Sequence, residues 1–284
     1  MARFPRQSRA VNNLADLADN FDTFLLDAFG VLNVGDTPIA GAPERIAALQ
    51  AAGKRVMVLS NAASYPKRVG LEKLRRLGYA LAPEDLLSSR EVLLSALTAR
   101  PGECPRERLG LIAPDTWGLE ELEGRGLAFV GDDRGVYDAV DGFVMLSAAG
   151  WSENRQALLE ASLTARARPV WVGNPDLVAP QERGLSLEPG HFAHRLADAA
   201  GVAPVFFGKP FANAFEAALA RLPQPVDRSR VVMVGDTLHT DILGGAAAGL
   251  ATALITGHGA LRGLDVAKAI AQSGIRPDFI LPDP

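Results

Sequence analysis

Short runs of apolar residues, each followed by turn-forming residues, recur toward both ends of the chain. Five of these runs are almost continuously hydrophobic, which is typical of strands buried on both faces of a parallel sheet. They span residues 23–26, 56–59, 205–207, 231–234 and 251–255. Between the first two, residues 42–52 place Ile46 and Leu49 on one helical face and precede Gly53, which predicts a helix with a glycine stop. The order strand, helix, strand predicts a parallel pair.

Further amphipathic segments at 68–77 and 215–222 give both ends of the chain the same alternation of strands and helices. We therefore predict an α/β fold with a Rossmann-like, doubly wound parallel sheet. In such a sheet, ligands bind beyond the carboxyl ends of the strands. The residues that come just after predicted strands, and that we expect at this edge, are Asp27, Ser60, Lys209 and Asp236.

An inserted domain is predicted from the spacing of these residues. Ser60 and Lys209 are 149 positions apart (209 − 60), far more than one crossover between neighbouring strands requires. Within this stretch, further apolar runs and a helical segment at 154–165 indicate that the insert is itself α/β. We predict a first core part at 1–82, an inserted α/β domain at 83–189 and a second core part at 190–284.

Composition and charge exclude several classes of partner. A net charge of −4 and a pI near 5.6 argue against nucleic-acid binding. Cys104 is the only cysteine, so an internal disulfide is excluded, and the N-terminal residues lack the apolar segment of a signal peptide. Residues 242–261 lack Asp, Glu, Lys and Arg, but their five glycines favour a helix and a buried strand over a membrane span. We predict a cytoplasmic protein without a membrane partner; its oligomeric state stays open, with a homodimer among the alternatives.

The first candidate for chemistry is Asp27, which stands where a hydrophobic strand ends and Gly30 opens a loop. A carboxylate in this position can act as a nucleophile that forms a covalent acyl phosphate or ester. The alternative is that Asp27 only caps the following turn.

A second group of polar residues follows the other predicted strands. Asp236 and Asp241 come after the strand at 231–234 and offer the oxygen ligands that Mg²⁺ prefers, although either could simply cap a helix. Ser60 and Asn61 could hold a phosphate oxygen through a hydroxyl and backbone N–H groups, or act as a helix cap. Lys209 could neutralise a transferring group, although an isolated lysine is usually solvated surface.

Taken in order, these residues resemble the four motifs of the haloacid dehalogenase (HAD) superfamily, which supply an Asp nucleophile, a Ser or Thr, a Lys and an acidic pair. The chain is most similar to class IIA members, the p-nitrophenyl-phosphatase-like, sugar and nucleotide phosphatases, which carry a large α/β cap between the second and third motifs. The resemblance implies a small phosphorylated metabolite as substrate and Mg²⁺ as cofactor. It also implies that the metal ligands are Asp27, the Phe29 carbonyl, Asp236 and, through water, Asp241, with Ser60 and Lys209 on the phosphate.

In the insert, the sequence from Gly173 to Asp176 resembles the Asn-Pro-Asp turn of class IIA caps. The resemblance implies that Asn174 and Asp176 face the substrate. A plain Asx turn is the alternative.

Phe29 departs from the phosphatase pattern. HAD phosphatases place a second Asp two residues after the nucleophile as the acid/base, and such groups contribute about 10²–10⁴-fold, so we expect impaired or altered phosphatase activity. Asp-Ala-Phe-Gly also resembles the opening of 2-haloacid dehalogenases, which need no metal. A third hypothesis is a protein that binds a phosphorylated metabolite without hydrolysing it. Asp236, Asp241 and the large insert favour the phosphatase; His239 and His258 are interpreted as solvated loop residues.

Overall fold

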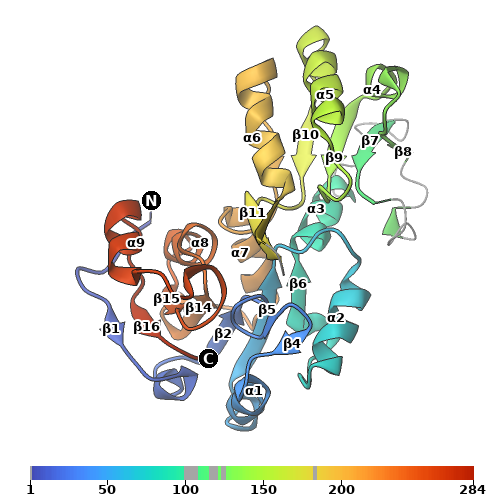
Figure 1. The fold of residues 1–284 in the computed structure, drawn as a ribbon. Coiled ribbons are helices and arrows are strands. Elements are labelled where there is room, and N and C mark those ends of the chain that lie inside the picture. Colours follow the sequence, from blue (N-terminus) through green and yellow to red (C-terminus); the bar gives the residue numbers. More distant parts are fainter. Residues whose placement is uncertain (1, 99–107, 115–120, 123–125, 182–183) are drawn as a thin grey trace. The chain divides into compact units, whose positions relative to one another are not determined.

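The structure is a computed structural model that describes residues 2–98, 108–114, 121–122, 126–181 and 184–284. The chain divides into two compact units (Figure 1). We call the unit formed by Met1–Ser60, Arg68–Leu87 and Lys209–Pro284 the core unit, and the unit formed by Asn61–Lys67 and Ser88–Gly208 the insert unit.

The core unit contains a seven-stranded sheet in the order β1-β16-β15-β14-β2-β5-β6. The pairs from β1 through β5 in this order are parallel, which confirms the predicted α/β class. The strands β2 and β14 are buried at every position, which explains why their sequences are apolar without alternation. The strands are β1 (Arg9–Ala10), β2 (Thr23–Leu26), β5 (Arg55–Ser60), β6 (Leu86–Ser88), β14 (Val231–Gly235), β15 (Ala251–Ile255) and β16 (Phe279–Leu281).

Helices connect these parallel strands. The predicted helix between β2 and β5 is α1 (Ala42–Ala51), whose Ile46 and Leu49 are buried in the core cluster as expected. Gly53, with φ of 75°, lies just after its end, as the glycine stop predicts. The other helices of the core unit are α2 (Lys67–Arg76), α7 (Ala212–Leu219), α8 (Leu243–Ala247) and α9 (Val266–Ser273), and a short hairpin follows β2, formed by β3 (Asn33–Val34) and β4 (Thr37–Pro38).

The insert unit has its own parallel sheet of five strands, in the order β13-β10-β9-β7-β8. These strands are β7 (Leu109–Ile112), β8 (Leu127–Phe129), β9 (Gly142–Met145), β10 (Val170–Val172) and β13 (Val205–Phe206). The unit also contains the helices α3 (Ser89–Thr98), α4 (Arg134–Ala139), α5 (Glu153–Ala165) and α6 (Pro189–Ala200), and a hairpin of β11 (Val178–Gln181) and β12 (Gly184–Leu187).

One predicted core strand lies elsewhere. The apolar run at 205–207 forms β13, which pairs with β10 of the insert unit rather than with a strand of the core sheet. Phe206 packs against the insert's hydrophobic cluster and stacks on His194 with ring centroids 4.8 Å apart. For this reason the insert unit reaches Gly208, further toward the C-terminus than the predicted insert at 83–189, and it also includes residues 61–67.

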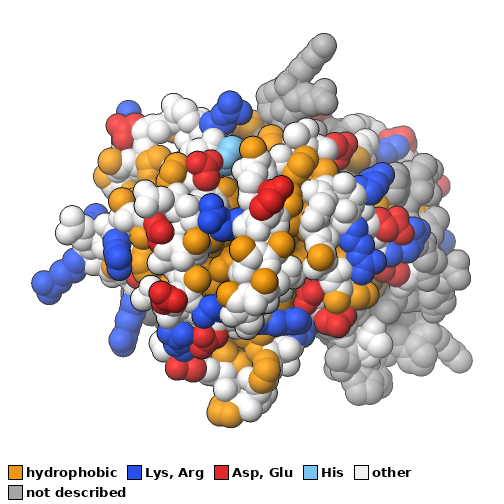
Figure 2. All heavy atoms as spheres, turned by 90° about the horizontal axis from the view of Figure 1, so that it is seen from below, with side chains coloured by type: hydrophobic (Ala, Val, Ile, Leu, Met, Phe, Trp, Pro, Cys, Tyr) orange, Lys and Arg blue, Asp and Glu red, His pale blue; other side chains and the backbone are white. Residues whose placement is uncertain are grey.

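Two surface properties bear on the sequence predictions. Among the helices of the described residues, none has the length and hydrophobicity that crossing a membrane would require. On the face drawn in Figure 2, acidic and basic side chains are interspersed rather than gathered by sign.

Candidate active site

Asp27 lies just past the carboxyl end of β2, and the neighbours of β2 in the sheet are β14 and β5. Its backbone N–H donates to the carbonyl of Val234 (2.8 Å), which extends the pairing of β2 with β14 by one residue. The Asp27 Oδ1 atom accepts from the N–H of Ala28 (2.7 Å), and the side chain is 15% exposed. The buried strand therefore fixes the backbone of Asp27 and leaves its carboxylate beyond the end of the strand.

Lys209 is the cation of this site and is almost fully buried. Its Nζ lies 2.7 Å from Asp27 Oδ1 and 2.7 Å from Asp241 Oδ1, so it bridges the two carboxylates. Burial alone would lower the pKa of Lys209, but the charges and hydrogen bonds of Asp241 and Asp27 outweigh burial and raise it. Lys209 is therefore a fixed positive charge rather than a solvated surface lysine.

The acidic pair lies beside these two residues. Asp236 follows β14, Asp241 belongs to the short π-helix η5 (Leu238–Ile242), and both side chains are buried. Thr237 contacts both, because its Oγ1 donates to Asp236 Oδ1 (3.0 Å) and its N–H donates to Asp241 Oδ2 (3.1 Å). Burial raises the pKa of each carboxyl group, and the negative charge of Asp27 raises both further.

The balance of charge in the site fits a divalent cation. Ligand oxygens of Asp27, Asp236 and Asp241 all lie within 4.8 Å of one another. When all are ionised, three carboxylates and the one ammonium of Lys209 leave two negative charges in excess (3 − 1 = 2). Compact groups of carboxylate oxygens are the ligands that hard divalent cations prefer.

Gly30 allows the loop after β2 to pass close to Asp236. Its φ is +73°, and a Cβ at this position would lie 2.5 Å from the Cγ of Asp236. Any side chain at position 30 would have to displace the carboxylate. The glycine that opens the loop in the sequence is thus also part of the wall around Asp236.

Ser60 is the last residue of β5, which pairs in parallel with β2, so the two strands end at the same edge of the sheet. The structure therefore places Asp27, Ser60, Lys209 and Asp236 in one unit, as the strand order predicts.

The other predicted binding residues belong to the insert unit and contact one another. The side-chain amide of Asn61 donates to Asp176 Oδ1 (2.8 Å). The N–H of Asp176 donates to Asn174 Oδ1 (3.0 Å), which is the hydrogen bond of an Asx turn, and the Asn174 amide donates to Glu188 Oε2 (3.1 Å). Glu188 is a polar partner that the sequence reasoning missed, and burial raises its pKa.

Comparison with known proteins shows the family of this chain. A family model described as haloacid dehalogenase-like hydrolase matches residues 24–127, and a second, HAD-hydrolase-like model matches residues 206–283. A human glycerol-3-phosphate phosphatase is 32% identical over 297 residues, which cover 95% of this chain and 90% of the human protein. The chain belongs to the haloacid dehalogenase-like hydrolase family.

Other relatives of this HAD chain are also named as phosphatases. A D-glycerol 3-phosphate phosphatase of Mycobacterium tuberculosis is 30% identical over 85% of this chain, and the chain spans only 65% of that protein's length. The fold resembles that of a possible sugar phosphatase from Cytophaga hutchinsonii with a TM-score of 0.84, 24% identity and 98% coverage of both chains. A glycerol phosphate phosphatase of M. tuberculosis, solved in complex with calcium, has a TM-score of 0.72 and 26% identity, covering 94% of this chain and 74% of that chain.

Phe29 occupies the position where the HAD pattern leads us to expect a second Asp. Its backbone forms an isolated bridge with Asn33, and the N–H of Gly30 donates to the Asn33 carbonyl (2.9 Å), so residues 29–33 form a tight turn that leads into β3. The side chain is half-buried. A phenyl ring has no proton to transfer, so position 29 of this HAD site contributes only its backbone and its shape.

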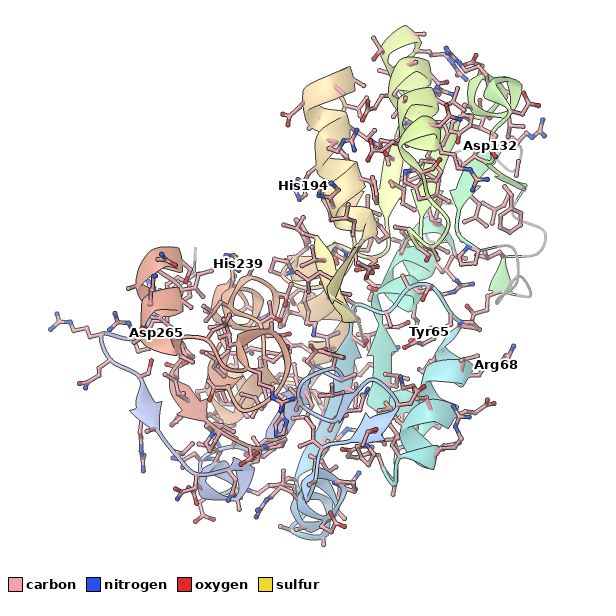
Figure 3. All side chains as sticks on the ribbon, viewed as in Figure 1. Tyr65, Arg68, Asp132, His194, His239 and Asp265 are labelled. Carbon is pink, nitrogen blue, oxygen red and sulfur yellow. The ribbon has the colours of Figure 1, made fainter. Side chains whose placement is uncertain are left out.

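Two residues that contact the acidic pair of the HAD site, Thr237 and Ala260, were missed by the sequence reasoning. Thr237 contacts both acids, and the N–H of Ala260, in a loop after β15, donates to Asp236 Oδ2 (2.6 Å). The contact of Ala260 could have been predicted from the Thr-Gly-His-Gly sequence directly after a predicted strand, because two glycines there indicate that the backbone approaches another group closely. By contrast His239, labelled in Figure 3, has an exposed side chain.

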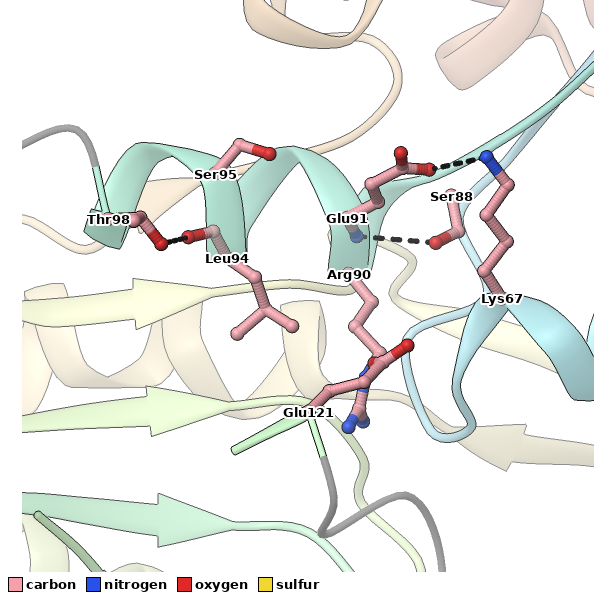
Figure 4. A pocket seen from close by; sticks show the side chains of 8 residues that line it. All are labelled: Lys67, Ser88, Arg90, Glu91, Leu94, Ser95, Thr98 and Glu121. Carbon is pink, nitrogen blue, oxygen red and sulfur yellow. Dashed lines mark hydrogen bonds and ion pairs between the residues drawn. The ribbon is translucent and has the colours of Figure 1, made fainter. Parts of the chain in front are cut away.

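A separate pocket in the insert unit is lined by charged residues that pair with each other (Figure 4). Lys67 Nζ lies 3.3 Å from Glu91 Oε2, and Arg90 Nε lies 2.8 Å from Glu121 Oε2. The remaining lining residues are Ser88, Leu94, Ser95 and Thr98. These pairs balance the charge of the pocket, so it lacks the excess of carboxylates seen around Lys209.

Proposed function

We propose that this chain is a magnesium-dependent phosphatase that acts on small phosphorylated metabolites through a covalent intermediate on Asp27. The observation that carries the proposal is the cluster of Asp27, Asp236 and Asp241 around Lys209 at the ends of parallel strands. The relatives named for glycerol 3-phosphate and acid sugar phosphatases support a short polyol phosphate or sugar phosphate as the substrate.

The proposed metal ligands are the carboxylates of Asp27 and Asp236, the carbonyl of Phe29 and, through water, the carboxylate of Asp241. The excess of carboxylates, together with the calcium complex of a relative, supports a divalent cation here, and Mg²⁺ is our choice because its ligands would all be oxygens. When bound, Mg²⁺ supplies positive charge that stabilises the oxygens of the transferring phosphoryl group.

In the first proposed step, Asp27 attacks the phosphorus atom and the bond between phosphorus and the leaving oxygen breaks. Oδ1 of Asp27 is held by Lys209 and the Ala28 N–H, which leaves Oδ2 as the other oxygen of the carboxylate. We therefore assign the attack to Oδ2. Water then attacks the phosphorus of the aspartyl phosphate, which restores the carboxylate and releases inorganic phosphate.

Lys209 and Ser60 are the proposed phosphate-binding residues of the core unit. Lys209 keeps its proton through both steps, because its pKa is raised by the two carboxylates it contacts, so it neutralises charge instead of transferring a proton. We propose Asn61, Asn174 and Asp176 as substrate-binding residues of the insert unit, supported by the hydrogen bonds that fix their orientation.

Phe29 determines how the leaving group departs. Since it cannot protonate the leaving oxygen, we propose that this proton comes from water or from the substrate, and that substrates with acidic leaving groups react fastest.

The test is a screen of phosphate esters and 2-haloacids with and without Mg²⁺, in which phosphate and halide release are both measured. We expect phosphate release that requires Mg²⁺ and is lost in Asp27→Asn. Release of halide without metal would instead establish the dehalogenase. Tight, magnesium-dependent binding of phosphate esters with no turnover across the panel would establish a binding protein.

A further inference from the structure

A segment after β15, which includes the start of the short 3₁₀ helix η6 (Gly259–Leu261), packs directly on Asp236. The N–H of Ala260 donates to Asp236 Oδ2 at 2.6 Å. At the preceding residue, Gly259, a Cβ would lie 1.8 Å from the same oxygen, and φ is +69°. Only glycine can satisfy both conditions, so the contact depends on the residue at position 259.

A neighbouring segment, residues 281–283, anchors this loop at three successive residues. The N–H of Thr256 donates to the carbonyl of Leu281 (3.0 Å), and the N–H of Gly257 donates to the carbonyl of Pro282 (2.9 Å). The third contact joins His258 Nε2 to Asp283 Oδ1 at 2.9 Å. Backbone hydrogen bonds therefore continue beyond the paired strands β15 and β16 as far as Gly257, and a side-chain contact follows at His258.

These contacts leave Asp236 little freedom. Its Oδ2 is held by the Ala260 N–H, and its Oδ1 accepts from Thr237 Oγ1 (3.0 Å). The Gly30 loop closes another side, since a Cβ there would also overlap the carboxylate. The position of this side chain is therefore set by three loops, only one of which carries it in the sequence.

We propose that the segment 256–260, anchored by residues 281–283, is a positioning element that holds the carboxylate of Asp236 in the orientation in which it binds the divalent cation. Gly259 and Ala260 make the contact, and His258 and Asp283 anchor it. This inference rests on the proposed function, because it assigns the segment to the proposed metal site. Groups that orient metal ligands typically change metal affinity by about 10–100-fold when they are removed.

The decisive experiment compares two glycine substitutions in the same region. Gly259→Ala and Gly263→Ala both place a side chain at a positive φ, +69° and +76°, but a Cβ at Gly263 meets nothing within 4 Å. We expect Gly259→Ala to weaken binding of Mg²⁺, measured by calorimetric titration of the metal into the full chain, by about tenfold or more. We expect Gly263→Ala to change the affinity by less than about twofold, because it carries the same backbone strain without the contact.

A milder pair of variants tests the anchor. His258→Ala and Asp283→Ala each remove the same partially exposed contact between the two side chains, so we expect Mg²⁺ affinity to fall by about two- to fivefold. Glu216→Ala is the matched control, because it removes the similarly exposed pair with Arg228 elsewhere in the core unit. It should leave Mg²⁺ affinity unchanged.

Two further readouts separate positioning from general destabilisation. The amide proton of Ala260 should shift in the NMR spectrum of the metal-free protein when Asp236→Asn removes its charged acceptor. Saturating Mg²⁺ should restore turnover in Gly259→Ala but not in Asp27→Asn.

Equal Mg²⁺ affinities for Gly259→Ala and Gly263→Ala would overturn this inference, and the proposed metal site would still stand if Asp236→Ala abolished binding. If the unmodified protein did not bind Mg²⁺ at all, the proposed site and the positioning role would both be wrong. If Gly259→Ala does not fold, the comparison of His258→Ala with Glu216→Ala decides the question.

Discussion

The core unit and the insert unit use the same architecture but treat buried charge in opposite ways. Both contain parallel sheets connected by helices. In the insert unit, the buried guanidinium of Arg168 donates to the carbonyls of Tyr137 (2.6 Å) and Val140 (3.0 Å) and to Ser162 Oγ (2.6 Å), and it lies over the ring of Phe143. In the core unit, three carboxylates share one ammonium.

This difference distinguishes a structural charge from a functional one. Arg168 donates to backbone carbonyls and to a hydroxyl, and these bonds hold the end of α4 against its neighbours. The buried charge is therefore stabilised without a bound ion or ligand. When all are ionised, the carboxylates around Lys209 are in excess, and only a bound proton or a bound cation can compensate their repulsion. The four predictions below test this contrast.

The largest effect should come from Asp27→Asn. The substitution removes the nucleophile with little change in volume, so we expect phosphate release to fall by about 10⁴-fold or more while the fold remains intact. Because it also removes one negative charge from the crowded site, the melting temperature of the metal-free protein should not fall. Steady-state turnover together with thermal unfolding checks both expectations, and unimpaired hydrolysis would remove Asp27 from the mechanism.

Phe29→Asp should increase the excess of negative charge in the site of the core unit and add the missing proton donor. We expect turnover of an alkyl phosphate to rise, by up to about 10²-fold, and turnover of p-nitrophenyl phosphate to rise much less, because its leaving group needs no proton. The fourth carboxylate should also lower the metal-free melting temperature. Rates for the two substrates in both proteins are the measurement, with circular dichroism as the control for folding. Unchanged or lower rates for both substrates in a folded, magnesium-binding variant would contradict the idea that Phe29 replaces a general acid.

Arg168→Met should affect stability alone. Removing the guanidinium leaves buried carbonyls without their donor, so we expect the free energy of unfolding to fall by about 3 kcal/mol, with no change in Mg²⁺ affinity. Arg134→Ala is the control in the same unit, because the exposed pair with Asp138 should contribute about 0.5 kcal/mol or less. Denaturant titration and calorimetry measure the two quantities, and a loss of Mg²⁺ affinity would break the contrast between the units.

The smallest effect should be a pH dependence of the metal-free protein. Burial raises the pKa of Asp236 from 3.8 to about 6 and that of Asp241 to about 8. A raised folded-state pKa favours the protonated form, so the stability these groups contribute is fully present below pH 3.8 and is lost as pH rises toward 8. The fall in melting temperature between pH 5 and 8 should be smaller in Asp236→Asn, and saturating Mg²⁺ should reverse it in the unmodified protein. An identical pH profile for both metal-free proteins would show that Asp236 is not in a repulsive environment.

Much of the fold and of the site is predictable from the sequence, for a local reason. The strands β2 and β14 are buried on both faces, so their residues must be apolar without interruption, and the polar residue that ends each run stands out. That residue is Asp27 in one case and, after Gly235, Asp236 in the other. Because parallel strands end at one edge, the sequence alone predicts that these carboxylates meet.

What the sequence leaves open depends on groups that are far apart in the chain. The run at 205–207 reads as any buried strand, and only its pairing with β10 assigns it to the insert unit. Lys209 reads as an ordinary surface lysine until the fold places its Nζ between Asp27 and Asp241. In the same way His258 reads as a solvated loop residue until Asp283, 25 positions away, lies beside it.

The α/β class, the strands that carry Asp27 and Asp236, and the residue types available for catalysis are therefore all predictable from local patterns in the chain. Hydrophobic patterning is sufficient for this, since burial acts on each residue through its own side chain and its near neighbours. How the charges compensate one another, and which backbone groups hold them, becomes visible only in the folded molecule. Electrostatic and hydrogen-bond energies depend on distances between groups, and residues such as Asp236 and Ala260, 24 positions apart, approach each other only when the sheet has formed.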